Sequence, residues 1–393
     1  MTAPGPVVAG HRRGRRPHRC AALTLTVAVL CGLTVSSAGV AYAAGGDPPP
    51  LPAAGTGCVG ASSVSVEQVP WPVARLAPML TWPLSRGAGV TVAVVDSGVG
   101  SPPGLAGAVQ AGRDVASGGR GDRDCSGRGT ALAGIVAARP VGGSPVVGMA
   151  PAASVLPIRI TDGNGRVPRD GVADGVRAAA RLGAEVILVG TAVATEDSRL
   201  RAAVAAAVAA DAVVVAAVAD GSQDSPAAGY PAADKRVLGV GGIDADGTPM
   251  QPQTPDLLAP GYGIVAVGGA GHYQVGGPAV AAAYVAGAAA LVRGYRPGLD
   301  QAQVRQRLNL TAIASGPADA GVVDPYAAVA DLAPERASRT PAARYGSLVL
   351  PRTRGTDPAI RRALWYAGAL LLVTLAVLAA AAVIRNRRHP TAR

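Results

Sequence analysis

The sequence predicts an α/β domain with a mostly parallel sheet and helices on both faces. Short apolar runs alternate with Ala-rich helical stretches between about residues 85 and 332. This alternation is typical of strands that are joined by crossover helices, and such connections produce a parallel sheet. The chain of 393 residues contains no Phe. Its core must therefore be built from small aliphatic side chains, which suits closely packed helix and sheet layers.

The predicted elements follow one another along this region. Apolar runs predict buried strands at residues 89–96, 154–160, 184–190, 212–218 and 235–243. Helical patterns predict helices at residues 170–183, 199–210 and 279–295, with Gly183 as the C-cap of the first. The last of these helices is hydrophobic, but it is too short and too rich in Gly to predict a membrane span.

The N-terminus has the three parts of a secretory signal peptide in residues 1–43. The charged stretch HRRGRRPHR precedes the apolar stretch CAALTLTVAVLCGLTV, and AYA at residues 41–43 forms a small-residue cleavage site. An uncleaved membrane anchor is the alternative interpretation. Residues 44–84 are predicted to be a Pro/Gly-rich leader and N-terminal extension, of which residues 44–57 have no core of their own. The main domain is predicted at residues 85–332.

The C-terminus predicts a membrane helix at residues 364–384. This run has 21 residues and no charged side chain, and at about 1.5 Å per residue a helix of this length spans roughly 31 Å. Trp365 and Tyr366 lie at its start, where an interfacial aromatic belt is expected. Together with the signal peptide, the run predicts an ectodomain outside the membrane, a polar linker at residues 333–363, and a short cytoplasmic tail at residues 385–393.

The positive charge of the chain is concentrated at its two ends. The formal net charge is +11, and five Arg lie in residues 1–43 and four in residues 385–393, with no acidic residue in either segment. The remaining 27 basic residues face 25 acidic ones. The charge therefore gives no reason to expect binding to nucleic acid.

Four cysteines are distributed between two segments of the chain. Cys20 and Cys31 would leave with the signal peptide, whereas Cys58 and Cys125 remain in the exported chain. An oxidising compartment favours a disulfide between these two residues. Two free or intermolecular thiols are the alternative.

Six motifs occur in chain order within the predicted domain. They are VAVVDSGV (92–99), GRGTALAGIVAA (127–138), GMAPAASVLPIRI (148–160), YPAADKRVLGVGGIDADG (230–247), PDLLAPGYGI (255–264) and GGPAVAAAYVAGAAALVR (276–293). Together they resemble the subtilisin-like serine proteases. DCSGRGT and VVDPYAAV (322–329) are similar to the corresponding motifs of mycosins, the membrane-anchored subtilases of type VII secretion systems. The resemblance implies a subtilisin-like fold, no cofactor or metal ion, and partners in the membrane complex of type VII secretion.

The resemblance also places the catalytic positions of the family on this chain. Asp96 retains the carboxylate that orients the catalytic base, whereas Arg128 replaces the histidine and Ala279 replaces the serine. Asp220 stands where the family has the asparagine of the oxyanion hole. Arginine stays protonated, alanine has no hydroxyl group, and a carboxylate donates no hydrogen bond to an oxyanion. These replacements predict that the usual serine protease mechanism is lost.

Two further hypotheses concern the charged residues of this site. Arg128 is expected to form an ion pair with Asp96, and with Asp220 if it lies close enough, because a guanidinium suits carboxylates. A side chain that extends into solvent is the alternative. His272 is the one histidine of the predicted ectodomain, and we expect it in an exposed loop rather than as a substitute base.

The residues therefore predict a catalytically inactive, membrane-anchored structural component associated with type VII secretion. Two alternatives belong to other classes. The cleft could serve as an extracellular peptide-binding module, or the chain could be a serine endopeptidase with a non-standard mechanism.

Overall fold

The computed structural model describes most of the predicted domain and one C-terminal helix. The described residues are 48–51, 58–60, 62, 64, 66–142, 144–219, 229–250, 255–268, 271–314, 320–332 and 358–388. The predicted signal peptide, Asp220, and most of the predicted linker and tail lie outside them. The chain divides into two compact units, Met1–Pro334 and Glu335–Arg393.

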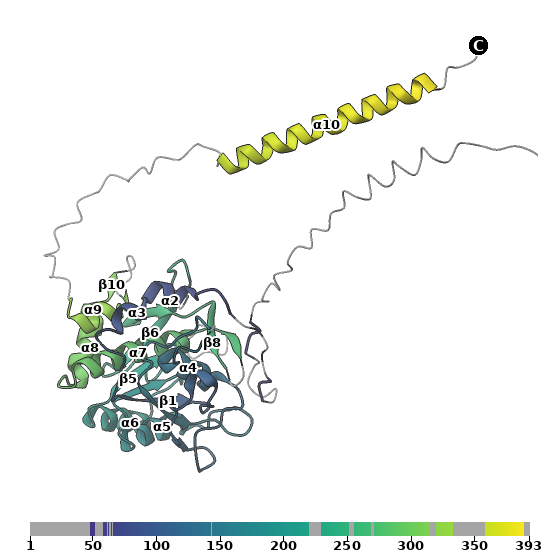
Figure 1. Cartoon of the computed structure of the whole chain (residues 1–393). Coiled ribbons are helices and arrows are strands. Elements are labelled where there is room, and N and C mark those ends of the chain that lie inside the picture. Colours follow the sequence, from purple (N-terminus) through teal and green to yellow (C-terminus); the bar gives the residue numbers. More distant parts are fainter. Residues whose placement is uncertain are drawn as a thin grey trace, which may run out of the picture. The chain divides into compact units, whose positions relative to one another are not determined.

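The second unit contains one described helix, α10 (Pro358–Arg388), which is drawn at the C-terminal end of the chain in Figure 1. It extends beyond both ends of the predicted membrane run at residues 364–384. Within the described part of the chain, no helix combines the length and the apolar character that crossing a membrane requires.

The first unit is built around a sheet in which nine described strands are joined. In their order across the sheet, the strands are β10 (Ile313–Ala314), β11 (Gly321–Val322), β7 (Leu257–Pro260), β6 (Leu238–Ile243), β5 (Val213–Ala217), β4 (Val186–Val189), β1 (Thr91–Asp96), β3 (Ser154–Arg159) and β2 (Arg113–Asp114). All neighbouring pairs are parallel except β10 and β11. β8 (Ile264–Val267) and β9 (His272–Val275) form a separate antiparallel hairpin.

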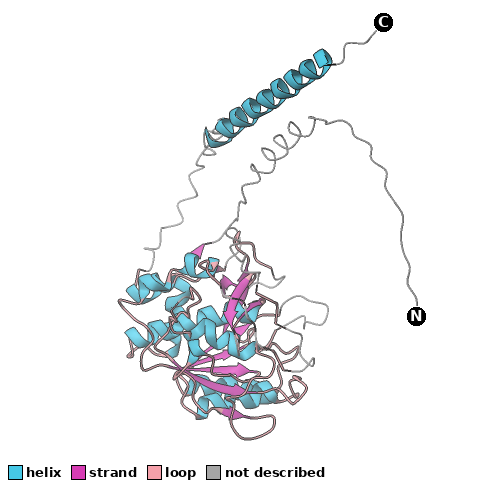
Figure 2. Ribbon diagram, turned by 45° about the vertical axis from the view of Figure 1, so that its right-hand side comes forward, coloured by secondary structure: helices cyan, strands magenta, loops and turns pink. Residues whose placement is uncertain are grey.

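Helices cover both faces of this sheet, as Figures 1 and 2 show. The helices of the unit are α2 (Trp71–Leu76), α3 (Pro78–Thr81), the 3-10 helix η1 (Pro103–Leu105), α4 (Arg128–Ala137), α5 (Gly171–Arg181), α6 (Ser198–Ala209), α7 (Pro278–Tyr295), α8 (Gln301–Leu310) and α9 (Pro325–Ala330). Val92 and Val94 of β1 pack with α4 and α7, whereas Ala93 and Val95 pack with α5 and α6. Successive side chains of a strand point to opposite faces, so a strand covered on both faces is apolar throughout. The predicted α/β fold is confirmed, and the five predicted strands correspond to β1, β3, β4, β5 and β6.

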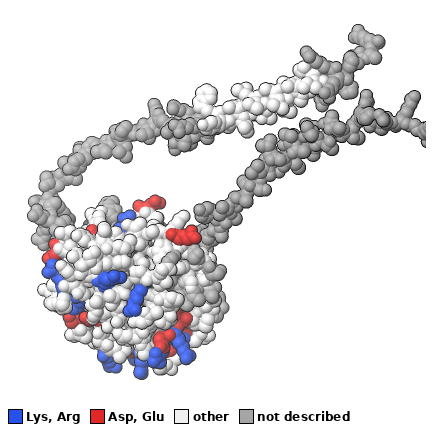
Figure 3. Space-filling model, in the orientation of Figure 1, with Lys and Arg blue, Asp and Glu red and all other residues white. Residues whose placement is uncertain are grey.

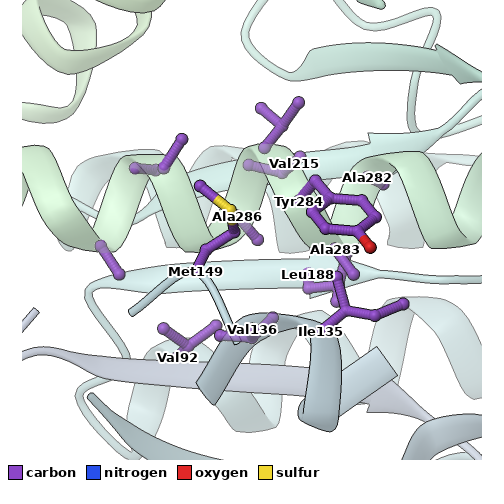
Figure 4. Close-up of a cluster of buried hydrophobic side chains, with 14 of the residues drawn as sticks. Val92, Ile135, Val136, Met149, Leu188, Val215, Ala282, Ala283, Tyr284 and Ala286 are labelled. Atoms are coloured by element: carbon purple, nitrogen blue, oxygen red, sulfur yellow. The ribbon is translucent and has the colours of Figure 1, made fainter. Parts of the chain in front are cut away.

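Helix α7 passes through the main core. Figure 4 shows Ala282, Tyr284 and Ala286 of this helix in one cluster with buried side chains of α4 and of the strands. Its many Ala residues allow the helix to approach the sheet closely, which explains why a strongly apolar helix is found inside the domain. Burial raises the pKa of the Tyr284 hydroxyl well above its ordinary value of 10.0.

The N-terminal extension is part of this unit. Leu76 of α2 is buried in the same core cluster as β1 and α7, and Leu51 packs against that cluster. The indole nitrogen of Trp82 donates a hydrogen bond to the carbonyl oxygen of Met149 at 3.0 Å. Leu51 of the predicted leader thus packs against the core of the main domain.

Charged side chains on the described surface do not gather by sign on the face seen in Figure 3. Basic and acidic groups lie close together there, with wide uncharged areas between them. Several charged side chains of the described residues form ion pairs, such as Arg199 with Asp170 at 2.8 Å and Arg201 with Glu196 at 2.7 Å. Such pairs between exposed groups add little to stability.

One arginine is different, because it is buried. The side chain of Arg293 is 5% exposed, and its Nη1 lies 2.8 Å from Asp211 Oδ2 and 2.9 Å from the carbonyl oxygen of Leu299. Asp211 Oδ1 also accepts a hydrogen bond from the backbone N–H of Gln301 at 2.6 Å. Arg293 thus joins the end of α7 to the turn before β5 and to the start of α8.

Replacement of Arg293 by Met is expected to lower the free energy of unfolding by about 2 kcal/mol, because the half-exposed Asp211 carboxylate and the carbonyl oxygens of Asp211 and Leu299 lose the hydrogen bonds of the guanidinium. Urea unfolding followed by circular dichroism measures this loss. Arg181→Met, at the exposed end of α5, is the matched control and should change little. Equal losses in the two variants would show that the contacts of Arg293 have no special role in stability.

Candidate functional site

A cleft of about 670 Å³ lies beside the carboxyl ends of β1 and β4 and the N-terminal ends of α4 and α7. Open α/β sheets place their functional sites at the carboxyl ends of the parallel strands. Asp96, Arg128 and Ala279 all line this cleft, so the structure brings three of the four predicted site residues together. The fourth, Asp220, lies outside the described residues.

The parallel register of β1 and β4 decides how the floor of the cleft is built. Val95 lies opposite Val189, so Asp96, the last residue of β1, lies beside Gly190, the residue that follows β4. A Cβ atom on Gly190 would lie 2.2 Å from Asp96 Oδ2. Position 190 must therefore be Gly for the Asp96 carboxylate to fit beside it.

Arg128, the first residue of α4, extends across this floor. Its Nη1 lies 2.6 Å from Asp96 Oδ2, and its Nη2 donates to the carbonyl oxygen of Gly190 at 2.5 Å. Nη1 also lies 3.4 Å from Thr191 Oγ1. The Asp96 side chain is 0% exposed, whereas the Arg128 side chain is 44% exposed. The expected ion pair with Asp96 is present, and the alternative of an unpaired Arg128 in solvent is wrong.

A second carboxylate, which we did not predict from the sequence, holds the start of α4 against the end of β1. Asp124 Oδ1 accepts hydrogen bonds from Ser97 Oγ and from the N–H of Gly127, both at 2.9 Å. Its Oδ2 accepts from the N–H of Thr130 at 2.8 Å and from Thr130 Oγ1 at 2.6 Å. These contacts satisfy donors that the first turn of a helix leaves unpaired. The sequence signal that could have predicted this role is an aspartate shortly before the start of a helix.

Burial raises the pKa of the Asp124 carboxyl above its ordinary value of 3.8. Hydrogen bonds from Thr130 and Ser97 act in the opposite direction, and the charge of Asp96 adds to the rise. Because the folded state holds this proton to a higher pH than the unfolded state, the stability that Asp124 contributes is complete below about pH 4. It is lost as the pH rises through the raised pKa.

The stability difference between the unaltered chain and an Asp124→Asn variant is therefore expected to shrink as the pH rises from about 3 to 7, because only the carboxyl group titrates. Urea unfolding at a series of pH values measures it. A difference that widens with rising pH would mean that the hydrogen bonds to the carboxylate outweigh burial.

Ala279 lies in the first turn of α7 and is 7% exposed. No side chain caps this helix, whose N-cap is Gly277 with φ of 108°. The Ala279 methyl group offers no nucleophile to the cleft. None of the described residues that line the cleft is His, Lys or Cys. Among these described lining residues, the hydroxyl groups belong to Ser97, Ser126, Thr161 and Thr191.

His272 is placed away from this floor. It begins strand β9 and is partly buried, which corrects the expectation of an exposed loop residue. Its Nε2 lies 3.1 Å from Ser144 Oγ, and its Nδ1 lies 3.3 Å from the carbonyl oxygen of Val64. Both ring nitrogens thus contact residues outside the cleft lining, and His272 is not among the residues that line it.

The N-terminal extension forms one wall of the cleft. Pro50 and Leu51 line it, and Pro50 is paired in a parallel bridge with Gln274 of β9. The N–H of Gln274 donates to the carbonyl oxygen of Pro49 at 2.9 Å, and its carbonyl oxygen accepts from the N–H of Leu51 at 3.2 Å. Only the tertiary structure reveals this contact, because no local pattern in residues 49–51 predicts it.

The extension is also covalently attached near the cleft. Cys58 and Cys125 form a disulfide with a Cα–Cα distance of 4.3 Å. Next to it, the N–H of Val59 donates to the carbonyl oxygen of Cys125 at 2.8 Å. Within the described residues, no group of three or more His, Cys, Asp or Glu is placed to hold a metal ion.

The strand order, the two helix layers and the meeting of Asp96, Arg128 and Ala279 at one cleft define a subtilisin-like α/β protein. The profile of the Subtilase family (peptidase S8) matches residues 87–347. The chain therefore belongs to the subtilase family.

Mycosins are among its similar relatives. Mycosin-3 of Mycobacterium tuberculosis is 32% identical over 385 residues, which covers 79% of this chain and 82% of the relative. Mycosin-4 of the same organism is 33% identical over 367 residues, covering 79% of this chain and 80% of the relative. The solved structure of the MycP3 protease from the type VII (ESX-3) secretion system has 30% identity and a TM-score of 0.61, and it covers 72% of this chain and 96% of that one.

Proposed function

We propose that this chain is a catalytically inactive, mycosin-like subtilase that acts as a membrane-anchored structural component associated with type VII secretion. The observation that carries the proposal is the position of the Arg128 guanidinium, which bonds to Asp96 at 2.6 Å and to the carbonyl oxygen of Gly190 at 2.5 Å. In this proposed role, the chain keeps the folded subtilase domain but has no protease activity.

The loss of catalysis follows from what a serine protease requires. The base must accept the proton of the nucleophile, and a guanidinium that remains protonated cannot do so. Asp96, which orients the base in the family, is here fully engaged with Arg128 and with the backbone N–H of Ser97. Ala279 supplies no hydroxyl group. Both ends of the proton transfer are therefore missing.

The association with type VII secretion is supported by the relatives. The solved structures that resemble this chain include MycP1 from the ESX-1 type VII secretion system, with 28% identity and a TM-score of 0.61. They also include MycP3 from the ESX-3 system. Because a folded domain can hold partners without catalysis, we infer a scaffolding or capping role in or beside such a complex.

The membrane anchor is supported by the sequence alone. The run at residues 364–384 has no charged side chain and is long enough to span a bilayer as a helix. Extraction of membranes with alkaline carbonate tests this part. We expect the full-length protein to stay in the membrane pellet, and its release into the supernatant would contradict the anchor.

A fluorophosphonate probe tests the loss of catalysis, because it labels activated serine nucleophiles. We expect no labelling of the purified full-length protein under conditions that label an active subtilisin completely. Labelling would instead support the alternative of an endopeptidase with a non-standard mechanism. Mass spectrometry would then identify the modified residue.

Co-purification after mild solubilisation tests the partner. We expect the tagged full-length protein in a large complex that contains type VII secretion proteins. A solitary protein without partners would contradict the structural role.

One observation favours the peptide-binding function as the second candidate: the cleft remains open at about 670 Å³ although its catalytic groups are replaced.

A further inference from the structure

Arg128 presents a cation to the cleft. Among the described residues that line the cleft, Arg128 is the one basic residue and Asp96 the one acidic residue. The Asp96 side chain is 0% exposed and lies behind the guanidinium, which is 44% exposed. A ligand that enters the cleft therefore meets the cation of the pair and not the anion.

The hydrogen bonds of Arg128 leave one edge of the guanidinium available. A guanidinium has five N–H donors. Nη1 is used by Asp96 and Thr191, and Nη2 donates one hydrogen to the carbonyl oxygen of Gly190. Asp96 and Gly190 lie side by side, so both acceptors take the edge formed by Nη1 and Nη2. Nε–H and the second Nη2–H have no partner among the described residues, and this edge suits a carboxylate that binds through two oxygens.

The helices around the cleft favour the same ligand charge. The N-termini of α4 and α7 both lie at the cleft, and neither helix has an acidic residue in its first turn. The N-terminus of α7 carries partial positive charge, which adds to the field of Arg128, whereas the N–H groups at the start of α4 are already bonded to the Asp124 carboxyl. Asp124 lies nearby as a second carboxyl group, but it is not among the residues that line the cleft.

The size and walls of the cleft indicate a ligand larger than a simple acid. A volume of about 670 Å³ lies in the range of sites that enclose drug-sized ligands, which are much larger than a simple acid. Apolar side chains form much of the wall, including Leu51, Leu132, Val167 and Val280. The backbone of Gln274 is already paired with the N-terminal extension, so this edge of β9 is not available for strand addition. Recognition must therefore depend on an end group and on side-chain contacts.

We propose that the cleft binds the free C-terminal carboxylate of an extended peptide, with the Nε and Nη2 edge of Arg128 as its partner. The apolar walls take the last side chains of the peptide, and the absence of a base and a nucleophile leaves the peptide intact. The arginine at the position of the family's histidine thus gives the cleft a side chain that can bind a carboxylate. This inference deepens the second candidate function, the binding of peptides in the cleft. It rests on the proposed loss of catalysis in one respect: the bound peptide is not cleaved.

Fluorescence anisotropy on the full-length protein tests the proposal with three labelled pools of random hexapeptides. The first pool has a free C-terminal carboxylate, the second has a C-terminal amide, and the third is amidated but carries one internal Glu. We expect the free-acid pool to bind at least about ten times more tightly than either amidated pool. Acetate at the peptide concentration should not displace it, because a small acid gains nothing from the apolar walls.

Two variants assign the effect to Arg128. Asp96→Asn combined with Arg128→Gln removes both charges together, so no buried charge is left unpaired. We expect this double variant to bind the free-acid and amide pools equally. Ala279→Glu adds a carboxylate to the cleft lining and leaves both residues of the ion pair unchanged, and it should weaken free-acid binding at least about tenfold. Arg120→Gln is the matched control, because Arg120 is 69% exposed, pairs with Asp122 and is not part of the cleft lining.

Equal affinity for the free-acid and amide pools would overturn the proposal, as would no binding of either pool up to about 1 mM. A preference for the free acid that persists in both variants would also overturn it. Displacement of the peptides by equal amounts of acetate would show that the site takes small acids instead. Mass spectrometry of the recovered peptides separates this test from that of the proposed function, because cleaved peptides contradict only the loss of catalysis.

Discussion

Removal of the Cys58–Cys125 disulfide by substitution of both cysteines with Ser is expected to lower the free energy of unfolding by about 4 kcal/mol. The bond closes a loop with a sequence separation of 67 residues, and the open chain regains the conformational entropy that this closure removes. Urea unfolding of the oxidised proteins measures the difference. The loss should exceed that caused by replacing Arg128 or Arg293, because closing a loop of this length destabilises the unfolded state by more than the contacts of either arginine contribute.

The same change is expected to loosen the wall of the cleft that the N-terminal extension forms. Val59 bonds to the backbone of Cys125, and Leu51 bonds to that of Gln274, so both contacts lose their covalent support. Hydrogen exchange at Leu51 and Gln274 should therefore become faster in the Ser/Ser variant. Reduction with dithiothreitol is the control, since it should weaken the unaltered protein and leave the variant unchanged. Equal stability of the two proteins under oxidising conditions would contradict the prediction.

Replacement of Arg128 by Ala is expected to lower the free energy of unfolding by about 3 kcal/mol. The change leaves the Asp96 carboxylate, which is 0% exposed, without its cation, and it removes a donor from the carbonyl oxygen of Gly190. Loss of one partner of a buried ion pair costs more than the pair itself contributes, because a buried charge remains. In the variant, water from the open cleft can reach Asp96. The loss of stability is therefore expected near the lower end of the range for broken buried ion pairs.

Thermal and urea unfolding check this effect against two other variants. Arg120→Ala breaks the exposed pair with Asp122 and should cause little change. Asp96→Asn combined with Arg128→Gln should cost less than Arg128→Ala, because it leaves no unpaired charge. If Arg128→Ala proves as harmless as Arg120→Ala, the pair is not structural, and Arg128 acts only toward ligands of the cleft.

The layers of the fold were predictable from the residues because they depend on local patterns. The apolar runs that became β1, β3, β4, β5 and β6 are each short and continuous, as strands covered on both faces must be. The short strands β2, β10 and β11 were not predicted, because each has only two residues and is defined by its neighbours in the sheet. Likewise, the β8–β9 hairpin forms a sheet of its own, and its partners lie in the N-terminal extension.

The sequence by itself determined the chemistry that this cleft lacks. Arg128 cannot act as a base and Ala279 cannot act as a nucleophile in any conformation, because protonation and side-chain composition are properties of the residues. The same is true of the apolar pattern that specifies the α/β layers.

Only the tertiary structure decided what the cleft contains instead. The contact of Arg128 with Gly190, the support of α4 by Asp124, and the wall formed by Leu51 join segments far apart in the chain. The parallel register of β1 and β4 places Asp96 beside Gly190, and a difference of one residue in that register would separate them. Such long-range contacts are set by the packing of the whole domain, and no local pattern of residues encodes them.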